Sequence, residues 1–408
     1  MQRIYLDHSA TTPIDKKVLK TMLPYLQDKF GNPSSIHQIG REAMDGVNTA
    51  RAQVASFLNS KPDEIVFTSG STESNNLAIK GLVESLLQRQ DLNSRHLFHI
   101  ITSTIEHHAV LESYKELKEG RIEVTYIPVQ QNGVVDYKKV KNAIRDNTVL
   151  VSIMYVNNEV GAIQPISEIG RIIKKINKDK AKNKNTNHSP KIYFHTDATQ
   201  AVNFLDCDTQ KLNVDLLSFS GHKIYGPKGV GVLFVKDGTP IVSLQKGGHQ
   251  ENNLRSGTLN VPGIVGLGQA IALLEKSVVA KNNKKIGKLR DMLIAGIQKN
   301  IPDCVFNIDT QIAVPSHAHI SFLGTEGESI LLALDAYGIA VSTGSACSAK
   351  DLQASHVLLA MDINKEKAHN SIRFSLGKNN TTEEVKKVLK VLPPIVQRFR
   401  KISPLYNK

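Results

Sequence analysis

The sequence has no tryptophan and only three cysteines, and its apolar residues occur in short runs. A membrane-spanning helix needs about 20 apolar residues in succession, and the longest run here, around residues 149–153, is far shorter. We therefore expect no contact with a membrane. The N-terminal sequence MQRIYLDHSA has no apolar stretch typical of a secretory signal. This predicts a cytoplasmic protein, or an organellar one whose targeting segment has been removed.

The cysteines Cys207, Cys304 and Cys347 are far apart and form no CxxC pair, which argues against a disulfide framework or a structural zinc site. Cys304 is predicted to be a packed residue. Cys207 stands between two aspartates, which raise a thiol pKa and make it a poor nucleophile. Cys347 lies among small polar residues in VSTGSACSAK, which is typical of an exposed, flexible loop.

Positive charge exceeds negative charge, with 51 Lys and Arg against 38 Asp and Glu. Such an excess of positive charge favours the binding of RNA, acidic proteins or anionic substrates. Much of it falls in residues 174–191, however, and aromatic residues make up only 5% of the chain. Because no basic helix alternates with aromatic residues, we expect no direct binding of nucleic acid. Residues 178–190, KDKAKNKNTNHSP, are predicted to form a solvated surface insertion.

Short β-branched runs alternate with helical patterns through the first two thirds of the chain. This alternation predicts an α/β fold with a mostly parallel sheet that is covered by helices on both faces. The predicted strands are 64–68, 99–103, 123–128, 149–155, 191–196, 216–219 and 231–235. The predicted helices are 72–84, 106–117, 137–144, 166–177, one long region at 263–300, 328–337 and 382–400.

The pattern changes near residue 261 and predicts two domains. A large domain is expected at residues 15–262. A smaller α/β domain is expected to combine residues 1–14 with 263–408 and to carry the Cys347 loop. Ligands of such sheets bind at the carboxyl ends of the strands, which is where most of the polar motifs fall.

Two of these motifs follow predicted strands directly. In TSGSTES, residues 68–74, free backbone N–H groups at a helix start can hold an anion, although a simple capping box is the commoner arrangement. In HTDATQ, residues 195–200, Asp197 at a strand end can balance a buried cation, a metal or a protonated ring nitrogen. A helix cap is an equally good interpretation of Asp197.

Two further motifs supply cations. Lys223 lies between glycines and small residues in SFSGHKIYGPKG, where partial desolvation would lower its pKa and make the amine a nucleophile for a carbonyl. Arg373 in SIRFSLG points away from Ile372 and Phe374, and suits either a bidentate pair with a substrate carboxylate or a surface salt bridge. A lysine, an aspartate, an anion site, an arginine and a thiol together fit pyridoxal phosphate chemistry on an amino acid.

With these motifs in order, the sequence resembles the cysteine desulfurases of the iron–sulfur cluster assembly and nitrogen-fixation type. These belong to the class V aminotransferase superfamily, which has the pyridoxal-phosphate fold type I with a seven-stranded, mostly parallel sheet. The resemblance extends from YLDHSATTP at residues 5–13 to SPL at residues 403–405. Its most specific pieces are GNPSS (31–35), TSGSTESNN (68–76), EH (106–107), VNNEVG (156–161), HTDATQ (195–200), SGHKIYGPKG (220–229), RSGTL (255–259), GSAC (344–347) and SIRFSLG (371–377).

The resemblance implies a role for each matching residue. Lys223 would bind pyridoxal 5′-phosphate covalently, Asp197 would keep its ring nitrogen protonated, and Gln200 would hydrogen-bond its phenolic oxygen. His107 would stack on the ring and act as an acid or base. The residues implied to hold the phosphate are Ser71, Thr72, Ser220, His222 and, from the other subunit of a homodimer, Thr258. The residues implied to bind the substrate carboxylate are Asn158 and Arg373.

The implied reaction converts L-cysteine to L-alanine. The Cys347 thiolate would attack the substrate sulfur, keep it as a persulfide and pass it to an acceptor. That acceptor would be an iron–sulfur scaffold protein, a protein of tRNA thiolation or another carrier. No resident metal is implied, although Cys347 would transiently contact an iron–sulfur cluster on a partner.

Two alternatives remain open at this point. A selenocysteine lyase or another class V enzyme would share Lys223 and Asp197 but need not use a cysteine on a loop. A non-catalytic basic binding protein, such as a tRNA-associated subunit, would need none of these residues for chemistry.

Overall fold

The computed structural model describes residues 3–89, 97–117, 121–182, 189–344, 354–404 and 406. Its largest element is a seven-stranded sheet with the strand order β2-β8-β7-β6-β5-β3-β4. The strands are β2 (Ile65–Thr68), β3 (Phe98–Ser103), β4 (Ile122–Ile127), β5 (Thr148–Ser152), β6 (Tyr193–Asp197), β7 (Leu216–Ser220) and β8 (Gly231–Val235). The predicted sheet is confirmed, and each predicted strand corresponds to one observed strand.

The sheet is mostly parallel, as predicted. Strands β4, β3, β5, β6 and β7 run parallel to their neighbours, and β8 is antiparallel to both β7 and β2. The predicted strand 149–155 was too long, because β5 ends at Ser152. Ile153 and Met154 are buried in the following loop, so their apolar character does not mark the strand end.

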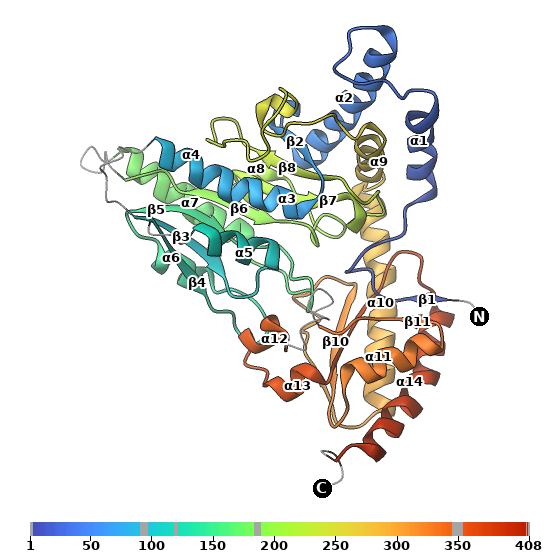
Figure 1. Cartoon of the computed structure of the whole chain (residues 1–408). Coiled ribbons are helices and arrows are strands. Elements are labelled where there is room, and N and C mark those ends of the chain that lie inside the picture. The colour runs from blue at the N-terminus through green and yellow to red at the C-terminus, as the bar shows by residue number, and fades with distance from the viewer. Residues whose placement is uncertain are drawn as a thin grey trace.

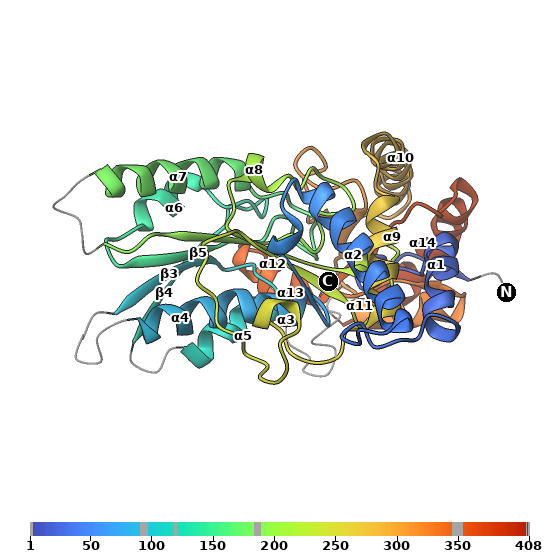
Figure 2. The same cartoon turned by 90° about the horizontal axis from the view of Figure 1, so that it is seen from above.

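Helices cover both faces of this sheet (Figure 2). One face carries α6 (Tyr137–Ala143), α7 (Ile166–Lys182) and α8 (Thr209–Leu212). The other carries α3 (Ser71–Asn76), α4 (Leu82–Gln88) and α5 (His108–Leu117). In α7 the buried residues Ile166, Ile169 and Ile173 recur every three to four positions, as one helix face requires.

The predicted helix 72–84 is a longer helical path that a π-helical segment, Leu77–Gly81, interrupts between α3 and α4. The Gly81 carbonyl accepts a hydrogen bond from Val242 N at 3.1 Å, outside the helix. A side chain at Gly81 would lie 2.7 Å from the Val242 carbonyl oxygen. This tertiary contact has no signature in the local apolar pattern, so the prediction missed it.

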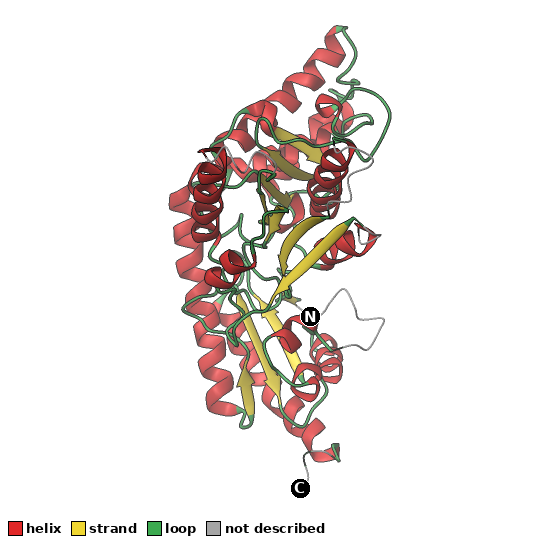
Figure 3. Ribbon diagram, turned by 90° about the vertical axis from the view of Figure 1, so that its left-hand side faces the viewer, coloured by secondary structure: helices red, strands yellow, loops and turns green. Residues whose placement is uncertain are grey.

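A second, three-stranded antiparallel sheet lies below the first (Figures 1 and 3). Its order is β12-β10-β9, with β9 (Cys304–Phe306), β10 (His317–Phe322) and β12 (Ser371–Ser375). The N-terminal strand β1 (Ile4–Tyr5) pairs with β11 (Ile339–Ala340), so the start of the chain joins the C-terminal region. The division into domains at residues 14/15 and 262/263 stays a prediction.

The remaining helices surround this region and the upper end of the molecule (Figure 1). They are α1 (Lys16–Gln27), α2 (Gln38–Leu58), α9 (Val261–Ala272), α10 (Lys276–Asn300), α11 (Gly327–Ala336), α12 (His356–Ala360), α13 (Lys365–His369) and α14 (Thr382–Ile402). The single helical region predicted at 263–300 was wrong, because α9 and α10 meet at a bend of 78°. Within the described ranges no single helix is long and apolar enough to cross a membrane, and only this bent pair meets the criteria together.

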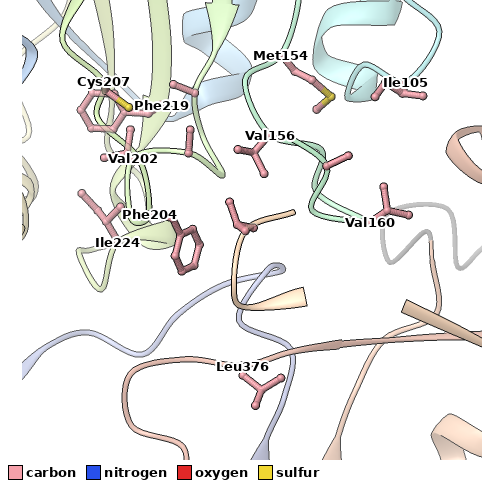
Figure 4. Packing of buried hydrophobic residues seen from close by; sticks show 14 of the residues in the cluster. Ile105, Met154, Val156, Val160, Val202, Phe204, Cys207, Phe219, Ile224 and Leu376 are labelled. Carbon is pink, nitrogen blue, oxygen red and sulfur yellow. The ribbon is translucent and has the colours of Figure 1, made fainter. Parts of the chain in front are cut away.

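The main core is a continuous cluster of buried apolar residues that extends beneath the strand ends. Figure 4 shows Cys207 in this cluster with Val202, Phe204 and Phe219. Burial raises the pKa of the Cys207 thiol, and Asp206 adds to the effect. Cys304 is half-buried against the same cluster. Cys304 therefore has the packed character that the sequence predicts. The predicted rise in the pKa of Cys207 is also confirmed, although burial rather than the neighbouring aspartate is its main cause.

The contact between α7 and α8 provides a test of the packing. A Cβ at Gly170 in α7 would lie 2.1 Å from the backbone oxygen of Leu212. We expect Gly170→Ala to lower the free energy of unfolding by about 1–3 kcal/mol, because two backbones must separate. Urea unfolding followed by circular dichroism measures the change.

Gly287→Ala in α10 is the matched control, since its nearest neighbour, Pro315 Cβ, would lie at a comfortable 3.6 Å. Alanine is a better helix former than glycine, so this variant should gain up to about 1 kcal/mol. Equal stability changes in the two variants would show that the α7–α8 contact is not tight.

Candidate active site

One cavity of about 390 Å³ lies where the carboxyl ends of the sheet strands meet the N-terminal segment and the small sheet. It contains residues from distant parts of the sequence, from Ser9 to Arg373. The predicted site residues that line it are Ser71, Thr72, His107, Asn158, Asp197, Gln200, His222, Lys223 and Arg373.

Three predicted site residues are not among the residues that line this cavity. Ser220 is buried at the end of β7, and Thr258 is exposed on the loop between β8 and α9. Cys347 lies outside the described residues, three positions after Gly344.

Lys223 ends a single 3₁₀ turn, Gly221–Lys223, that follows β7. Its Nζ donates hydrogen bonds to the carbonyl oxygens of Ser9 and Ala10, at 2.5 and 2.8 Å. The turn is tied to the N-terminal segment a second time, because Thr12 Oγ1 donates to the His222 carbonyl at 2.8 Å. The amine is thereby directed into the cavity by a short loop with little freedom.

Asp197 is the last residue of β6 and is 5% exposed. Its Oδ1 accepts from Thr199 N at 2.9 Å and its Oδ2 from Asn75 Nδ2 at 2.7 Å. A buried carboxylate that faces a cavity in this way is suited to a cationic ring nitrogen.

The sequence analysis did not identify Asn75, which holds Asp197 in place from α3. The residue lies inside the quoted TSGSTESNN motif, but only its distance to Asp197, 122 positions along the chain, reveals the contact. Asn75 Oδ1 and Thr199 Oγ1 are buried without a partner in the described structure. Such orphaned polar atoms mark a place for a bound polar group.

The helix that begins at Ser71 has Gly70 as its N-cap, so no side chain caps its first turn. Glu73 reaches back to the residue before the N-cap, where it accepts from Ser69 N at 2.7 Å, and it also accepts from Arg255 Nε at 2.9 Å. The first-turn N–H groups beside Ser71 and Thr72 are thus left to the cavity, which favours an anion. His222 completes this side, and burial lowers its pKa to about 4, helped by Lys223 and Lys228.

Arg373 forms a buried ion pair rather than the surface salt bridge that the sequence left open. Its Nη2 donates to Asp7 Oδ1 at 2.8 Å and its Nη1 to the Asn158 carbonyl at 3.0 Å. Its Nε is buried and has no partner in the described structure. The guanidinium therefore lies in the cavity wall next to Asn158 with donor capacity to spare.

His107 stands between β3 and α5, and its Nδ1 accepts from Ala109 N at 3.1 Å. Burial lowers its pKa, Asp197 opposes the shift, and Lys223 and His108 reinforce it. The ring is therefore neutral near pH 7 and can take up a proton or pack against a flat ligand.

Two buried glutamates to which no sequence pattern assigns a role lie at the site: Glu159 lines the cavity, and Glu106 precedes the lining residue His107. Glu106 accepts from Ser103 Oγ at 2.6 Å and from Met154 N at 2.9 Å, and burial raises its pKa to about 8 with a contribution from Asp197. Burial raises the pKa of Glu159 to about 7, while Ser355 and Arg373 oppose the shift. Both lie in quoted motifs, EH and VNNEVG, but only the fold shows their burial.

His108 and His356 also line the cavity, with ring centroids 4.9 Å apart. No local sequence pattern marks this pair, since it joins the first residues of α5 and α12 across 248 positions.

Comparison with known proteins places the chain in a family. Residues 4–388 match the family Aminotransferase class-V. The chain belongs to the class-V aminotransferases. Enzymes of this family depend on pyridoxal phosphate, which agrees with the lysine, the aspartate and the anion-binding helix start in one cavity.

Individual relatives and solved structures give a more specific comparison than the family alone. The cysteine desulfurase IscS of Dictyoglomus turgidum is 47% identical over 405 residues, covering 99% of this chain and 97% of that protein. A solved NifS-like protein has a TM-score of 0.87 and 38% identity over 97% of this chain and 100% of its own. A solved structure of SspA in complex with cysteine has a TM-score of 0.77 and 35% identity over 93% and 100% of the two chains.

The pKa of Glu106 gives this class-V aminotransferase a testable pH dependence. The pKa of Glu106 is 4.5 in the unfolded chain and about 8 in the folded chain. Between these two pH values the folded chain keeps the proton on Glu106, whereas the unfolded chain releases it. Wild-type stability therefore falls as pH rises through this range, and Glu106→Gln removes that contribution. Relative to wild type, E106Q should gain at least about 1.4 kcal/mol, the equivalent of one pKa unit, between about pH 5 and pH 8.

Urea unfolding of the cofactor-free protein at several pH values measures this difference. Glu84→Gln, an exposed site on α4, controls for the loss of one negative charge. A stability difference between E106Q and wild type that does not change with pH would contradict the raised pKa.

Proposed function

We propose that the protein is a cysteine desulfurase that converts L-cysteine to L-alanine and keeps the sulfur as a persulfide on Cys347. The observation that carries this proposal is that Lys223, Asp197 and Arg373 line one cavity. An amine, a carboxylate for a ring cation and a guanidinium for a carboxylate are what an amino-acid substrate and pyridoxal phosphate need together. The similar proteins named cysteine desulfurase, and the related structure solved with cysteine, point to the substrate.

When bound, pyridoxal phosphate supplies an electron sink that makes the substrate Cα–H bond acidic and weakens the bond to sulfur. Asp197, which Asn75 and Thr199 hold in position, would keep the ring nitrogen protonated. Gln200 would bind the phenolic oxygen and His107 would cover the ring. The phosphate would be held by Ser71, Thr72 and His222, with Ser220 at the end of β7.

The substrate is oriented by its carboxylate, which binds the free donors of Arg373 and the side chain of Asn158. Lys223 Nζ is the base that removes the Cα proton and returns it. It has two carbonyl acceptors, Ser9 and Ala10, that hold the ammonium form after the proton has been taken. His107, neutral near pH 7, is placed to exchange a proton with the substrate.

Sulfur transfer uses the thiolate of Cys347. It attacks the substrate sulfur, a sulfur–sulfur bond forms, and the bond between the substrate Cβ and its sulfur breaks. The electron pair of that bond stays with the substrate, whose β-carbon takes up a proton and becomes the methyl group of alanine. The thiol and L-cysteine are thus converted to a persulfide and L-alanine without an external oxidant.

The proposal includes a homodimer in which Thr258 reaches the phosphate site of the partner copy. Thr258 is exposed and does not line the cavity of its own chain. The α1–α2 region also exposes large apolar side chains, among them Phe30 at 69% and Ile36 at 89%. An exposed apolar surface of this kind is typical of protein interfaces.

We propose that the sulfur acceptor is a protein, either an iron–sulfur scaffold or another sulfur carrier. The outer sulfur of the Cys347 persulfide has to be passed to another thiol or to a cluster before the next turnover. A cytoplasmic location suits this chemistry, since free thiols persist in a reducing compartment.

Cys347→Ser tests the proposed function. With L-cysteine and a reductant, wild-type protein should form alanine and sulfide, whereas C347S should lose at least about 99% of both, because the attacking thiolate is absent. Alanine, sulfide, the visible spectrum of the cofactor and the mass of each cysteine-containing peptide are measured together.

Cys207→Ser and Cys304→Ser are the matched controls and should keep their activity. Sulfide release that persists in C347S would overturn the proposal, and activity on selenocysteine alone would favour a selenocysteine lyase. The wild-type protein should show a visible cofactor band that is lost in Lys223→Ala. If the wild-type protein shows no such band, a non-catalytic binding protein would be favoured.

Asp197→Asn tests the role of the buried carboxylate. The variant keeps the hydrogen-bonding shape but loses the charge that holds the ring nitrogen protonated, so turnover should fall by about 100-fold or more while folding is retained. Cofactor content and turnover are measured on the same sample. Turnover close to wild type would contradict the assigned role.

A further inference from the structure

The strand β2 forms one edge of the described seven-stranded sheet, where it pairs with β8 alone. Alternate residues of an antiparallel strand direct their backbone groups to opposite edges. The Ile65 carbonyl and the Phe67 N–H face the open edge, and both residues are buried. A buried backbone group without a partner is costly, so this edge needs one donor and one acceptor.

An arginine and a glutamate supply these two partners. Arg51, from α2, donates from Nη1 to the Ile65 carbonyl at 2.5 Å. Glu251, from the loop between β8 and α9, accepts from Phe67 N at 2.8 Å through Oε2. The two side chains also bond each other twice, Nη2 to Oε1 at 2.6 Å and Nη1 to Oε2 at 3.0 Å. The pair thus takes the place of a neighbouring strand at this edge.

The backbone at Glu251 has an uncommon conformation. Glu251, Asn252 and Asn253 have φ angles of 47°, 55° and 65°. Asparagine adopts such left-handed angles fairly readily, whereas glutamate does so rarely. Conformations of this kind persist where the surrounding contacts impose them. The bonds from Glu251 to Arg51 and to β2 therefore hold the loop in a shape that its own sequence does not favour.

The same loop is bonded a second time to the chain that enters α3. Arg255, four residues after Glu251, donates from Nε to Glu73 Oε1 at 2.9 Å. Glu73 lies in the first turn of α3, and its Oε2 accepts from Ser69 N at 2.7 Å. The N–H groups of Phe67 and Ser69 are thus both held by carboxylates, and the loop 251–255 connects the two carboxylates.

This ring of contacts encloses the connection from β2 to α3. Ser71 and Thr72, which follow Ser69 by two and three residues, line the cavity. No side chain caps the first turn of α3, because its N-cap is Gly70. The direction of the first N–H groups therefore depends on how the connection is held. Donors that are already in position bind an anion more strongly, because they need no rearrangement when it arrives.

We propose that Arg51 and Glu251 form a positioning pair, which replaces a strand at the edge of β2 and thereby holds the start of α3 in the geometry that retains the cofactor phosphate. This inference rests on the proposed function, which assigns Ser71 and Thr72 to the phosphate. Neither member of the pair lines the cavity, and neither takes part in a chemical step.

The test compares the binding of pyridoxal phosphate and of pyridoxal, which lacks the phosphate, to the cofactor-free protein. Glu251→Ala should raise the Kd of pyridoxal phosphate at least about 10-fold, because the phosphate donors lose their fixed arrangement. The Kd of pyridoxal should change by less than about twofold, because it has no phosphate for these donors to hold. A merely structural role would weaken both ligands equally, and that result would overturn the proposal.

A matched control separates positioning from the loss of a buried arginine. Arg400 of α14 is 5% exposed and does not line the cavity. Like Arg51, it donates to backbone carbonyl oxygens, those of Leu323 and Asp303 at 2.9 Å each. Arg51→Met should weaken pyridoxal phosphate selectively, whereas Arg400→Met should lose stability in urea but keep both Kd values. Equal weakening in R51M and R400M would contradict the proposal.

Coupling between the two residues provides a further check. If they act as a unit, the double variant Arg51→Met, Glu251→Ala should bind pyridoxal phosphate no more than about twofold more weakly than the weaker single variant. Losses that multiply would show that the two side chains act separately.

Glu251→Gln keeps the size of the side chain and one acceptor oxygen, so it replaces E251A if that variant does not fold. It should still raise the Kd of pyridoxal phosphate at least about threefold, because an amide cannot accept both donors of the guanidinium. Wild-type affinity in folded E251Q would count against the pair.

Hydrogen exchange tests the contacts without any cofactor. In E251A the Phe67 amide should exchange at least about 10-fold faster than in wild type and R400M, because it loses its acceptor. The Ser69 amide should also exchange faster, since Arg255 no longer holds Glu73 firmly. Wild-type exchange at Phe67 in E251A would refute the role of the pair at the strand edge.

These readouts separate this inference from the proposed function. If wild type binds pyridoxal phosphate but makes no alanine from L-cysteine, the proposed activity fails, and the affinities and exchange rates still decide the role of the pair. If wild type makes alanine but E251A matches it in affinity for pyridoxal phosphate and in exchange at Phe67, this inference fails alone.

Discussion

The site depends on the N-terminal segment, whose backbone lies between the two sheets and is bonded to both. The Ser9 carbonyl accepts from Lys223 Nζ and from Gln200 Nε2, which belong to the large sheet. On the other side, Ser9 N donates to Ser375 Oγ of β12, and Asp7 pairs with Arg373. One short stretch of chain therefore sets the distance between the amine and the guanidinium. A shift of this stretch would move both groups and would change their separation.

The electrostatics of the cavity follow from three buried acids that are held differently. Asp197 is held by two N–H donors and lines the cavity, an arrangement that suits a cation. Glu106 and Glu159 are fully buried, and burial raises the pKa of each toward or beyond neutrality. Their protonated forms cost far less to bury than carboxylates. Proton uptake by these two glutamates reduces the negative charge around the cavity.

The sequence predicted the parts of this design that are local. Lys223 and Asp197 follow strand ends, and the alternation of strands and helices gives the sheet on which such ends meet. The π segment at Leu77–Gly81 and the bend between α9 and α10 were missed, because tertiary contacts rather than local patterns decide them. Asn75 and Glu159 were missed for the same reason, since their hydrogen-bond partners, Asp197 and Ser355, are 122 and 196 positions away.

Backbone pairing also connects Arg373 to the chain just before Gly344. Arg373 N donates to the Ser342 carbonyl at 2.7 Å, and Ser342 N donates to the Arg373 carbonyl at 3.2 Å. Ser342 is two residues before Gly344, so Arg373 and the last residues described before position 345 share one backbone ladder. In the proposed function, a substrate held at its carboxylate by Arg373 would lie beside this ladder, whereas Lys223 and Asp197 come from the strand ends of the large sheet. The proposed carboxylate site and the proposed cofactor site therefore belong to different sheets.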